Sequence, residues 1–119
     1  MVRAVRGAIT VENNDREEIL AATEELLREI LEKNCIKQSD MVKIIFTLTS
    51  DLNAVFPAVA ARNMGITNVP LMCMSEIPVE GALKKCVRIL LDFNTQKTLD
   101  DIKHIYLKGA KVLRPDLVC

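Results

Sequence analysis

One segment of this 119-residue chain has the pattern of a long amphipathic helix, and the remaining apolar segments are short. Between residues 15 and 34, apolar positions recur three and four apart, and charged residues fill the opposite side. The apolar stripe consists of Ile19, Leu20, Thr23, Leu26, Leu27, Ile30 and Leu31. Asp15 is a favourable N-cap, and Glu18 three residues later is typical of a capping box. Such a stripe needs a broad apolar partner, which favours packing against a sheet.

The other apolar segments are rich in β-branched residues, which is typical of strands. Strands are predicted over 3–10, 42–49, 69–74, 86–93, 105–107 and 110–113. A short helix is predicted over 58–63, and a single helical turn over 98–103. This order predicts an α+β domain in which one long helix covers a mixed β-sheet.

One long helix covers only one face of such a sheet. We expect the other face to carry apolar groups as well, and a face of that kind needs a partner. The expected groups are alternate residues of the fourth strand: Val87, Ile89, Leu91 and Phe93. The sequence therefore predicts an oligomer.

Composition excludes several classes of protein. A mass of 13.3 kDa suits a single domain, residues 1–119, that buries about two thirds of its surface. Lys plus Arg and Asp plus Glu both count 16, and aromatic residues make up 3%, so we expect no nucleic-acid partner. No apolar run reaches the roughly 18 residues of a membrane span, and charge interrupts the N-terminus too early for a signal peptide. We expect a cytoplasmic protein that does not bind membranes.

The sequence lacks the residue patterns typical of metal sites and of nucleophilic catalysis. Four scattered cysteines, without a CxxC pair, are expected to be reduced: Cys35, Cys73, Cys86 and Cys119. With one histidine, His104, the ligand spacings of a zinc site are missing, so no metal is expected. The four glycines are too far apart for a phosphate-binding loop. His104 is expected to be a solvent-facing strand residue rather than a catalytic base.

The most unusual feature is arginine within or beside apolar segments. There are four such residues: Arg6, Arg62, Arg88 and Arg114. Arg88 interrupts the apolar strand 86–93, and Arg6 shares its strand face with two alanines. Each of them alone fits an edge position or a side chain that reaches out to water. Together, as planar bidentate donors, they indicate a site for a small polycarboxylate.

Three further residues have the chemistry to complete such a site. Cys73 and Glu76 lie at the end of the third strand, where their odd spacing puts them on opposite faces. A shared site therefore requires a bend near Ser75. Tyr106 is expected in the core, with its hydroxyl able to reach a carboxylate oxygen. The alternative is that Glu76 is an exposed loop carboxylate and Cys73 a small buried apolar residue.

Several blocks of sequence, in order along the chain, carry a resemblance to a known family. The blocks are Val5-Arg6-Gly7-Ala8, Ala54-Val55-Phe56-Pro57-Ala58, Val69-Pro70 with Cys73-Met74, Lys84-Lys85-Cys86-Val87-Arg88, His104-Ile105-Tyr106-Leu107 and Val112-Leu113-Arg114-Pro115-Asp116-Leu117. In these blocks the chain resembles the monofunctional chorismate mutases of the Bacillus type over essentially its whole length. The resemblance implies a homotrimer whose sheets form a pseudo α/β barrel, with active sites between neighbouring subunits.

The resemblance also implies an isomerase of aromatic amino-acid biosynthesis, which converts chorismate to prephenate by an intramolecular Claisen rearrangement. No cofactor, metal or covalent intermediate is implied. Catalysis then consists of holding the folded conformer and stabilising the charge that grows on the ether oxygen. Two other functions stay open: a non-catalytic trimeric sensor of an aromatic-pathway carboxylate, and a small trimeric imine deaminase.

The resemblance implies a role for each candidate residue. Arg88 would donate to the ether oxygen and to a carboxylate. Arg6 and Tyr106 would hold the side-chain carboxylate. Glu76, assisted by Cys73, would accept a hydrogen bond from the ring hydroxyl. The physical argument is strongest at Arg88, because an interaction that strengthens only in the transition state raises the rate.

Three residues would act at the margin of the site. The resemblance implies that Phe56 packs against the substrate ring from the neighbouring subunit. It also places Arg62 and Arg114 near the mouth of the site, where they would help hold the ring carboxylate.

Overall fold

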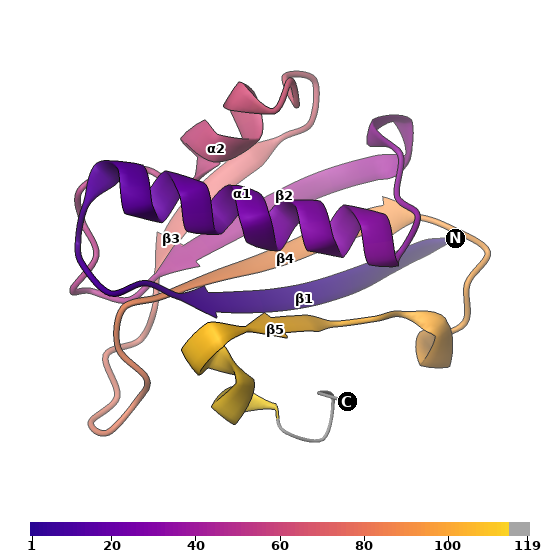
Figure 1. The fold of residues 1–119 in the computed structure, drawn as a ribbon. Coiled ribbons are helices and arrows are strands. Elements are labelled where there is room, and N and C mark those ends of the chain that lie inside the picture. The colour runs from indigo at the N-terminus through magenta and orange to yellow at the C-terminus, as the bar shows by residue number, and fades with distance from the viewer. Residues whose placement is uncertain (115–119) are drawn as a thin grey trace.

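A mixed sheet with one long helix along it forms the body of the molecule, in a computed structural model that describes residues 1–114 (Figure 1). The strands are β1 (Val2–Thr10), β2 (Met41–Leu48), β3 (Leu71–Ser75), β4 (Cys86–Asn94) and β5 (Ile105–Leu107). The helices are α1 (Arg16–Lys33) and α2 (Ala58–Asn63), with 3-10 turns η1 (Gln38–Asp40), η2 (Leu99–Asp101) and η3 (Lys108–Leu113). The predicted α+β fold is confirmed.

The strand order across the sheet is β3-β2-β4-β1-β5. The central strand β4 is antiparallel to both of its neighbours, β2 and β1. The two outer pairs, β1 with β5 and β2 with β3, are parallel. The first strand of the chain therefore lies between the last two, and residues far apart in sequence meet at the middle of the sheet (Figure 1).

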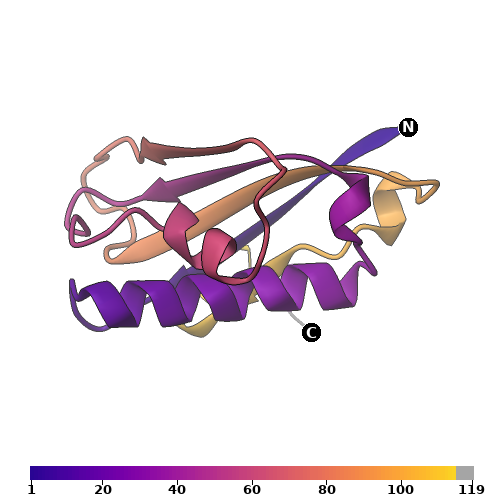
Figure 2. The ribbon, with the colours of Figure 1, turned by 90° about the horizontal axis from the view of Figure 1, so that it is seen from above.

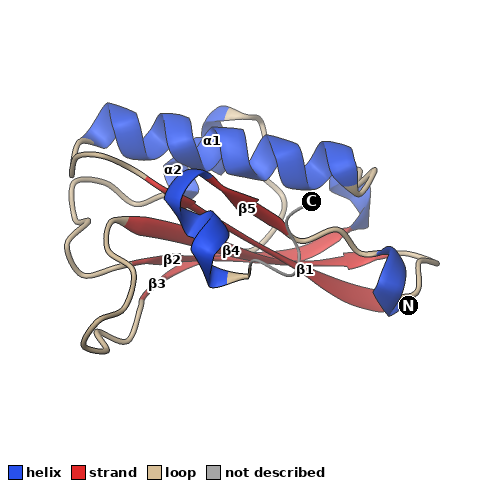
Figure 3. Cartoon of the chain, turned by 60° about the horizontal axis from the view of Figure 1, so that its bottom comes forward, coloured by secondary structure: helices blue, strands red, loops and turns tan. Residues whose placement is uncertain are grey.

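Helix α1 runs along one face of the sheet (Figures 2 and 3), and polar contacts fix both of its ends. At the N-cap, the Asp15 carboxylate accepts from the Glu18 backbone N–H at 3.0 Å. The Glu18 carboxylate accepts from the backbone N–H groups of Glu12 and Asn13, so only half of the predicted capping box forms here. At the other end, the buried Asn34 amide bonds the backbone of Lys103 through both its oxygen and its nitrogen.

The main core lies between α1, α2 and this face of the sheet. Among its fully buried members are Ile9, Ile19, Leu26, Leu27, Ile30, Ile44, Phe46, Ile89 and Leu91. Gly7 lies where α1 comes closest to β1: a Cβ there would be 2.7 Å from Ile30 Cδ1 and 3.0 Å from the Ile105 carbonyl oxygen. The lack of a side chain on Gly7 therefore sets the distance between α1 and the sheet.

The residues that we expected on the uncovered face of the sheet were the wrong ones. Four β4 side chains belong to the core beneath α1: Val87, Ile89, Leu91 and Phe93. Successive strand residues point to opposite faces, so the other parity, which includes Cys86, Arg88, Leu90 and Asp92, forms the open face. The sequence did carry the correct parity: both charged residues of β4, Arg88 and Asp92, fall in the second set, so the wholly apolar set is the one that the helix covers.

The segment predicted as a strand over 110–113 is instead the 3-10 turn η3. Lys108 has φ 53°, which ends β5, and Ala110 and Leu113 then pack three residues apart on a small cluster. Arg114 consequently follows a turn rather than a strand. The remaining predicted bounds differ by a few residues: the third strand begins at Leu71, and the turn over 98–103 is shorter, with Thr98 as its cap.

Candidate active site

A row of residues crosses the open face of the sheet from β2 to β5. Thr47 on β2 is the register partner of Arg88 on β4, which is in turn the partner of Ala8 on β1. Ala8 is then the partner of Tyr106 on β5. Arg88 and Tyr106 lie on either side of the small residue Ala8. Because adjacent strands are about 4.8 Å apart, the backbones of Arg88 and Tyr106 are separated by about two strand spacings. The predicted residues on β4 and β5 are therefore close neighbours across the sheet.

The Arg88 guanidinium lies near a carboxylate but its Nε–H makes no hydrogen bond among the described residues. Its Nε atom is buried and has no hydrogen-bond partner among residues 1–114. Its nearest acidic group is Glu76, whose Oε2 lies 3.8 Å from Nε, too far for a hydrogen bond. The side chain as a whole is 42% exposed, so its outer nitrogens reach the open face. A buried donor left without an acceptor costs about 1–3 kcal/mol, and a bound anion would remove that cost.

Cys86 lies beside Arg88 on the same face, two positions earlier on β4. Burial raises the pKa of the Cys86 thiol, and this effect outweighs the opposite influence of the Arg88 charge. The thiol is therefore neutral at neutral pH and does not compensate the guanidinium. The charge that faces the Arg88 guanidinium on the open face therefore comes from Glu76 and not from Cys86.

Glu76 follows directly after β3 and stays attached to the sheet. Its backbone N–H donates to the Leu48 carbonyl oxygen at 2.9 Å. The Thr47 hydroxyl donates a short hydrogen bond to Glu76 Oε2. The Glu76 side chain is 24% exposed, which leaves the carboxylate accessible from the open face. Glu76, Thr47 and Arg88 thus form a compact group of one anion, one hydroxyl and one cation.

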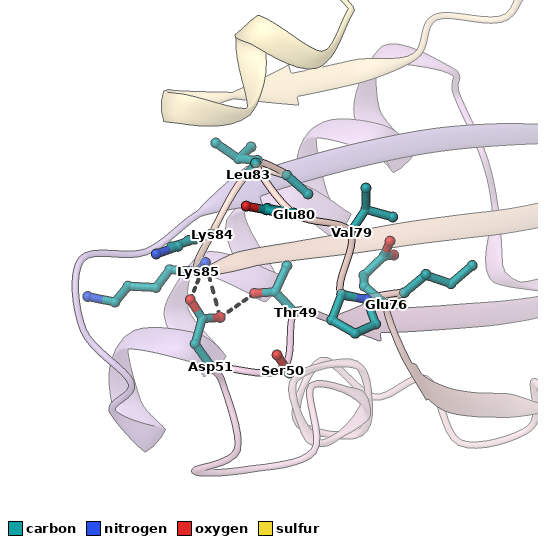
Figure 4. Close-up of a pocket in the computed structure, with 13 residues that line it drawn as sticks. Thr49, Ser50, Asp51, Glu76, Val79, Glu80, Leu83, Lys84 and Lys85 are labelled. Atoms are coloured by element: carbon teal, nitrogen blue, oxygen red, sulfur yellow. Dashed lines mark hydrogen bonds between the residues drawn. The ribbon is translucent and has the colours of Figure 1, made fainter.

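The loop from Ile77 to Lys85, together with the end of β2, encloses a cavity of about 640 Å³ that Glu76 also lines (Figure 4). Opposite the loop, the Asp51 carboxylate accepts twice from the Lys85 backbone N–H, at 3.0 and 3.2 Å, and once from the Thr49 hydroxyl. The Thr49 oxygen accepts from the Cys86 backbone N–H at 3.0 Å. Lys85 has φ 51°, so this network holds a strained turn three residues before Arg88.

Tyr106 and Arg6 lie on the β1–β5 side of the open face. Tyr106 is 8% exposed and packs with Ala8, Cys86 and Ala110. The Arg6 side chain is exposed, and its backbone N–H donates to His104 Nδ1 at 3.0 Å. His104 is half-buried and its ring nitrogen has a structural partner, so the expectation of a solvent-facing strand residue holds only in part. Its pKa is below the usual value of 6.5, first because of burial and then because of Arg6 and Arg114.

A second set of predicted residues lies apart from this group. Phe56 is 71% exposed just before α2, and Arg62 is exposed in the last turn of α2. Cys73 packs against the core on the helix-covered face, because its register partner is the buried Phe46. The bend that would bring Cys73 to the Glu76 side of the sheet does not form within this chain. The structure therefore divides the predicted residues into two groups.

Two predictions fall at the end of the described chain. Arg114 is half-buried at the end of η3. Cys119 and the block from Pro115 to Leu117 lie outside the described residues. The cysteines within 1–114, namely Cys35, Cys73 and Cys86, are free thiols. In the same part of the chain, no three His, Cys, Asp or Glu residues are grouped as metal ligands, and neither helix could cross a bilayer.

Three residues of this region were not predicted from the sequence: Thr47, Thr49 and Asp51. Each acts through a hydrogen bond whose partner is set by strand register or by the fold of a loop. One signal was present: Lys43, Thr47 and Thr49 are polar and share one parity of the strand, which marks one face as different. The sequence does not reveal that Thr47 lies between Glu76 and Arg88.

The fold and the site define a class of protein: a small α+β domain whose open sheet face carries a cation, a carboxylate and a phenol. The chain belongs to the chorismate mutase type I family, whose model matches residues 2–117. It is 48% identical over 118 residues to chorismate mutase AroH of Bacillus subtilis, covering 98% of this chain and 93% of that protein. It is also 48% identical to chorismate mutase AroH of Thermus thermophilus, with 98% and 97% covered.

A solved structure agrees with these relatives. The chorismate mutase from Clostridium thermocellum superimposes with a TM-score of 0.91 at 55% sequence identity. The match covers 92% of this chain and 98% of that one. The likeness therefore extends over nearly the whole fold, and the predicted family is confirmed.

Proposed function

We propose that this protein is an isomerase that converts chorismate to prephenate within a site on the open face of the sheet. The observation that carries the proposal is the Arg88 Nε–H, which is buried and without an acceptor in residues 1–114. In the rearrangement the ether carbon–oxygen bond breaks while a carbon–carbon bond forms within the same molecule. All atoms and electrons stay in the substrate, so no nucleophile, oxidant or proton donor is required.

The proposed mechanism is electrostatic. Negative charge grows on the ether oxygen as its bond to carbon lengthens, and a preset Arg88 N–H stabilises that charge. The interaction is stronger in the transition state than in the bound substrate, so it raises kcat. Arg6 and Tyr106 hold the side-chain carboxylate, and Glu76 accepts the hydrogen bond of the ring hydroxyl. These contacts hold the folded conformer, which lowers the entropic part of the barrier.

The proposed site is completed by a neighbouring copy in a homotrimer. Phe56, Arg62 and Cys73 lie apart from Arg88 within one chain, so they reach a substrate there only from another subunit. Large exposed apolar side chains support such an interface: Phe56, Met72, Met74, Ile77 and Val79. They lie on or near β3, an edge strand of the sheet. Arg114, at the end of η3, is proposed to help at the mouth. The cytoplasmic location stays a prediction.

The test is to incubate the pure protein with chorismate, without added metal or cofactor. Turnover is measured as the loss of the diene absorbance of chorismate. Arg88→Lys keeps the charge but loses the planar fork. We expect it to cost about 3 kcal/mol of transition-state stabilisation, the scale of one lost oxyanion donor. Arg28→Lys, on the exposed side of α1, is the matched control and should leave kcat unchanged.

Two outcomes would contradict parts of the proposal. Near-normal kcat in Arg88→Lys would remove Arg88 from its assigned role. Chorismate binding without any prephenate would favour the sensor instead of the enzyme.

A further inference from the structure

We infer that Thr47 is a positioning residue, which holds Glu76 away from Arg88 and so keeps the Arg88 Nε–H available for the substrate's ether oxygen. This inference rests on the proposed function and deepens it. It concerns the state of the empty site, before any substrate has entered. The Glu76 carboxylate and the Arg88 guanidinium share one face of the sheet, yet they do not form a hydrogen-bonded pair.

The geometry places Thr47 between the two charged groups. Strand β2 lies between β3, which leads into Glu76, and β4, which carries Arg88. Thr47 is the register partner of Arg88, and its hydroxyl donates to Glu76 Oε2. That same oxygen is the one that lies 3.8 Å from Arg88 Nε. Thr47 therefore binds the atom that would otherwise be the natural acceptor for the guanidinium.

A small movement would close the remaining gap. A charge-assisted N–H···O bond is about 2.8 Å long, so Oε2 needs to move only about 1 Å to pair with Nε. Such pairing would satisfy the buried donor, which is unpartnered within 1–114. It would also give the substrate a competitor, because the ether oxygen would have to displace a carboxylate. The Thr47 hydrogen bond opposes this movement.

The rigidity of the threonine side chain makes it suitable for this role. Branching at Cβ restricts its χ1 angle, so the hydroxyl is held in one direction. The side chain is half-buried within β2 and cannot follow Glu76 towards Arg88. Thr47 engages one carboxylate oxygen and so leaves the other, Glu76 Oε1, for a donor such as a ring hydroxyl. One hydroxyl thus orients the carboxylate and protects the cation.

The test compares Thr47→Val, which keeps the shape and removes the hydroxyl, with Thr47→Ser, which keeps the hydroxyl. We expect Thr47→Val to lower kcat/KM by about 10-fold to 100-fold, the scale of a 1 Å misplacement, and Thr47→Ser to recover most of it. Thr95→Val is the matched control: it removes a hydroxyl that accepts from the Lys97 backbone, in the loop after β4. It should leave kcat/KM within about 2-fold, as remote surface changes do.

A second readout does not depend on turnover. In ¹⁵N-resolved spectra of the ligand-free protein, the Arg88 Nε–H should move downfield and exchange more slowly in Thr47→Val, because it gains a carboxylate acceptor. In Thr47→Ser and Thr95→Val the resonance should stay at the wild-type position. If Thr47→Val does not fold, Thr47→Ala provides the same comparison without the hydroxyl.

The outcomes separate the two proposals. An unchanged Arg88 resonance together with unchanged kcat/KM in the variant without the hydroxyl would overturn the role of Thr47, while the wild-type activity stands. Loss of activity with an unchanged resonance would also overturn it, because Glu76 would not have moved onto Arg88. Failure of the wild-type protein itself to convert chorismate would instead overturn the proposed function.

Discussion

His104 shows, at the scale of one residue, how a side chain that resembles a catalytic base can be structural. Its Nδ1 must carry a lone pair to accept from the Arg6 backbone N–H. The neutral imidazole is therefore the form that the fold uses. Burial and the positive charges of Arg6 and Arg114 all lower the pKa of His104, which favours that form. Because Arg6 belongs to the candidate site, His104 fixes the backbone that carries it.

This lowered pKa predicts how stability changes with pH. The unfolded chain takes up a proton on histidine near its ordinary pKa of 6.5, whereas the folded chain does so only at lower pH. The stabilising contribution is thus fully present above pH 6.5 and is lost as the pH falls through the folded pKa. We expect the Tm to fall between pH 7.5 and 5.5. Thermal scans should show a smaller fall in His104→Asn, which has an oxygen acceptor that does not titrate.

A steeper fall in His104→Asn than in the wild type would contradict this account. The test is clean because His104 is the one histidine of the sequence. Side chains titrating in this pH window are otherwise carboxylates at its acid end.

Single site residues were predictable from the sequence where the side chain was of an unusual type for its segment. Arg88 and Arg6 stand out in the sequence because charge within an apolar strand is unusual. Glu76 and Tyr106 needed the family resemblance, since a loop carboxylate and a lone tyrosine are ordinary. Thr47 and Asp51 were not predictable, because their partners depend on register and on a left-handed turn at Lys85.

At the scale of elements, the contact between α1 and β1 determines how the helix sits on the sheet. Gly7→Ala would add a methyl group 2.7 Å from Ile30 Cδ1 and 3.0 Å from the Ile105 carbonyl oxygen. We expect it to lower the free energy of unfolding by about 1–3 kcal/mol, as overpacking does. Ile30→Val removes the clashing methyl and costs about 0.5–1.5 kcal/mol on its own. In the Gly7→Ala background, Ile30→Val should lower the free energy of unfolding by less than it does in the wild type.

Urea denaturation of the two single variants and the double variant measures this coupling. Strictly additive effects, or an unchanged stability in Gly7→Ala, would contradict the close contact.

Helices and strands were predicted well where a long segment had a strong hydrophobic periodicity, and poorly where the segment was short. The stripe from Ile19 to Leu31 gave α1 almost to the residue. Residues 110–113 were misassigned, because four residues fit a strand and a 3-10 turn equally well. The open face was misassigned at β4, although the charged residues Arg88 and Asp92 both lie on the parity that faces away from α1.

At the scale of the whole molecule, the proposed trimer predicts that two inactive variants can restore each other. Arg88→Ala damages one half of a site, and Phe56→Asp damages the half that the neighbouring subunit presents. In trimers reassembled from equal amounts, about a quarter of the interfaces combine two intact halves. We expect activity well above the sum of the separate variants.

Light scattering should give three times 13.3 kDa, about 40 kDa, for each variant and for the mixture. Activity in the mixture that equals only the sum of its parts would show that each site lies within one chain.

The position of β1 between β4 and β5 also has a consequence for how the protein is made. Val2 pairs with Asn94 and Gly7 with Ile105, so the strand that leaves the ribosome first finds neither neighbour until nearly all of the chain has been synthesised. Helix α1 forms early, but the sheet closes late, and folding limited by such distant pairings is slow. During that interval the nascent N-terminal strand exposes an unpaired edge, which is the part of this chain that a chaperone has most reason to shield.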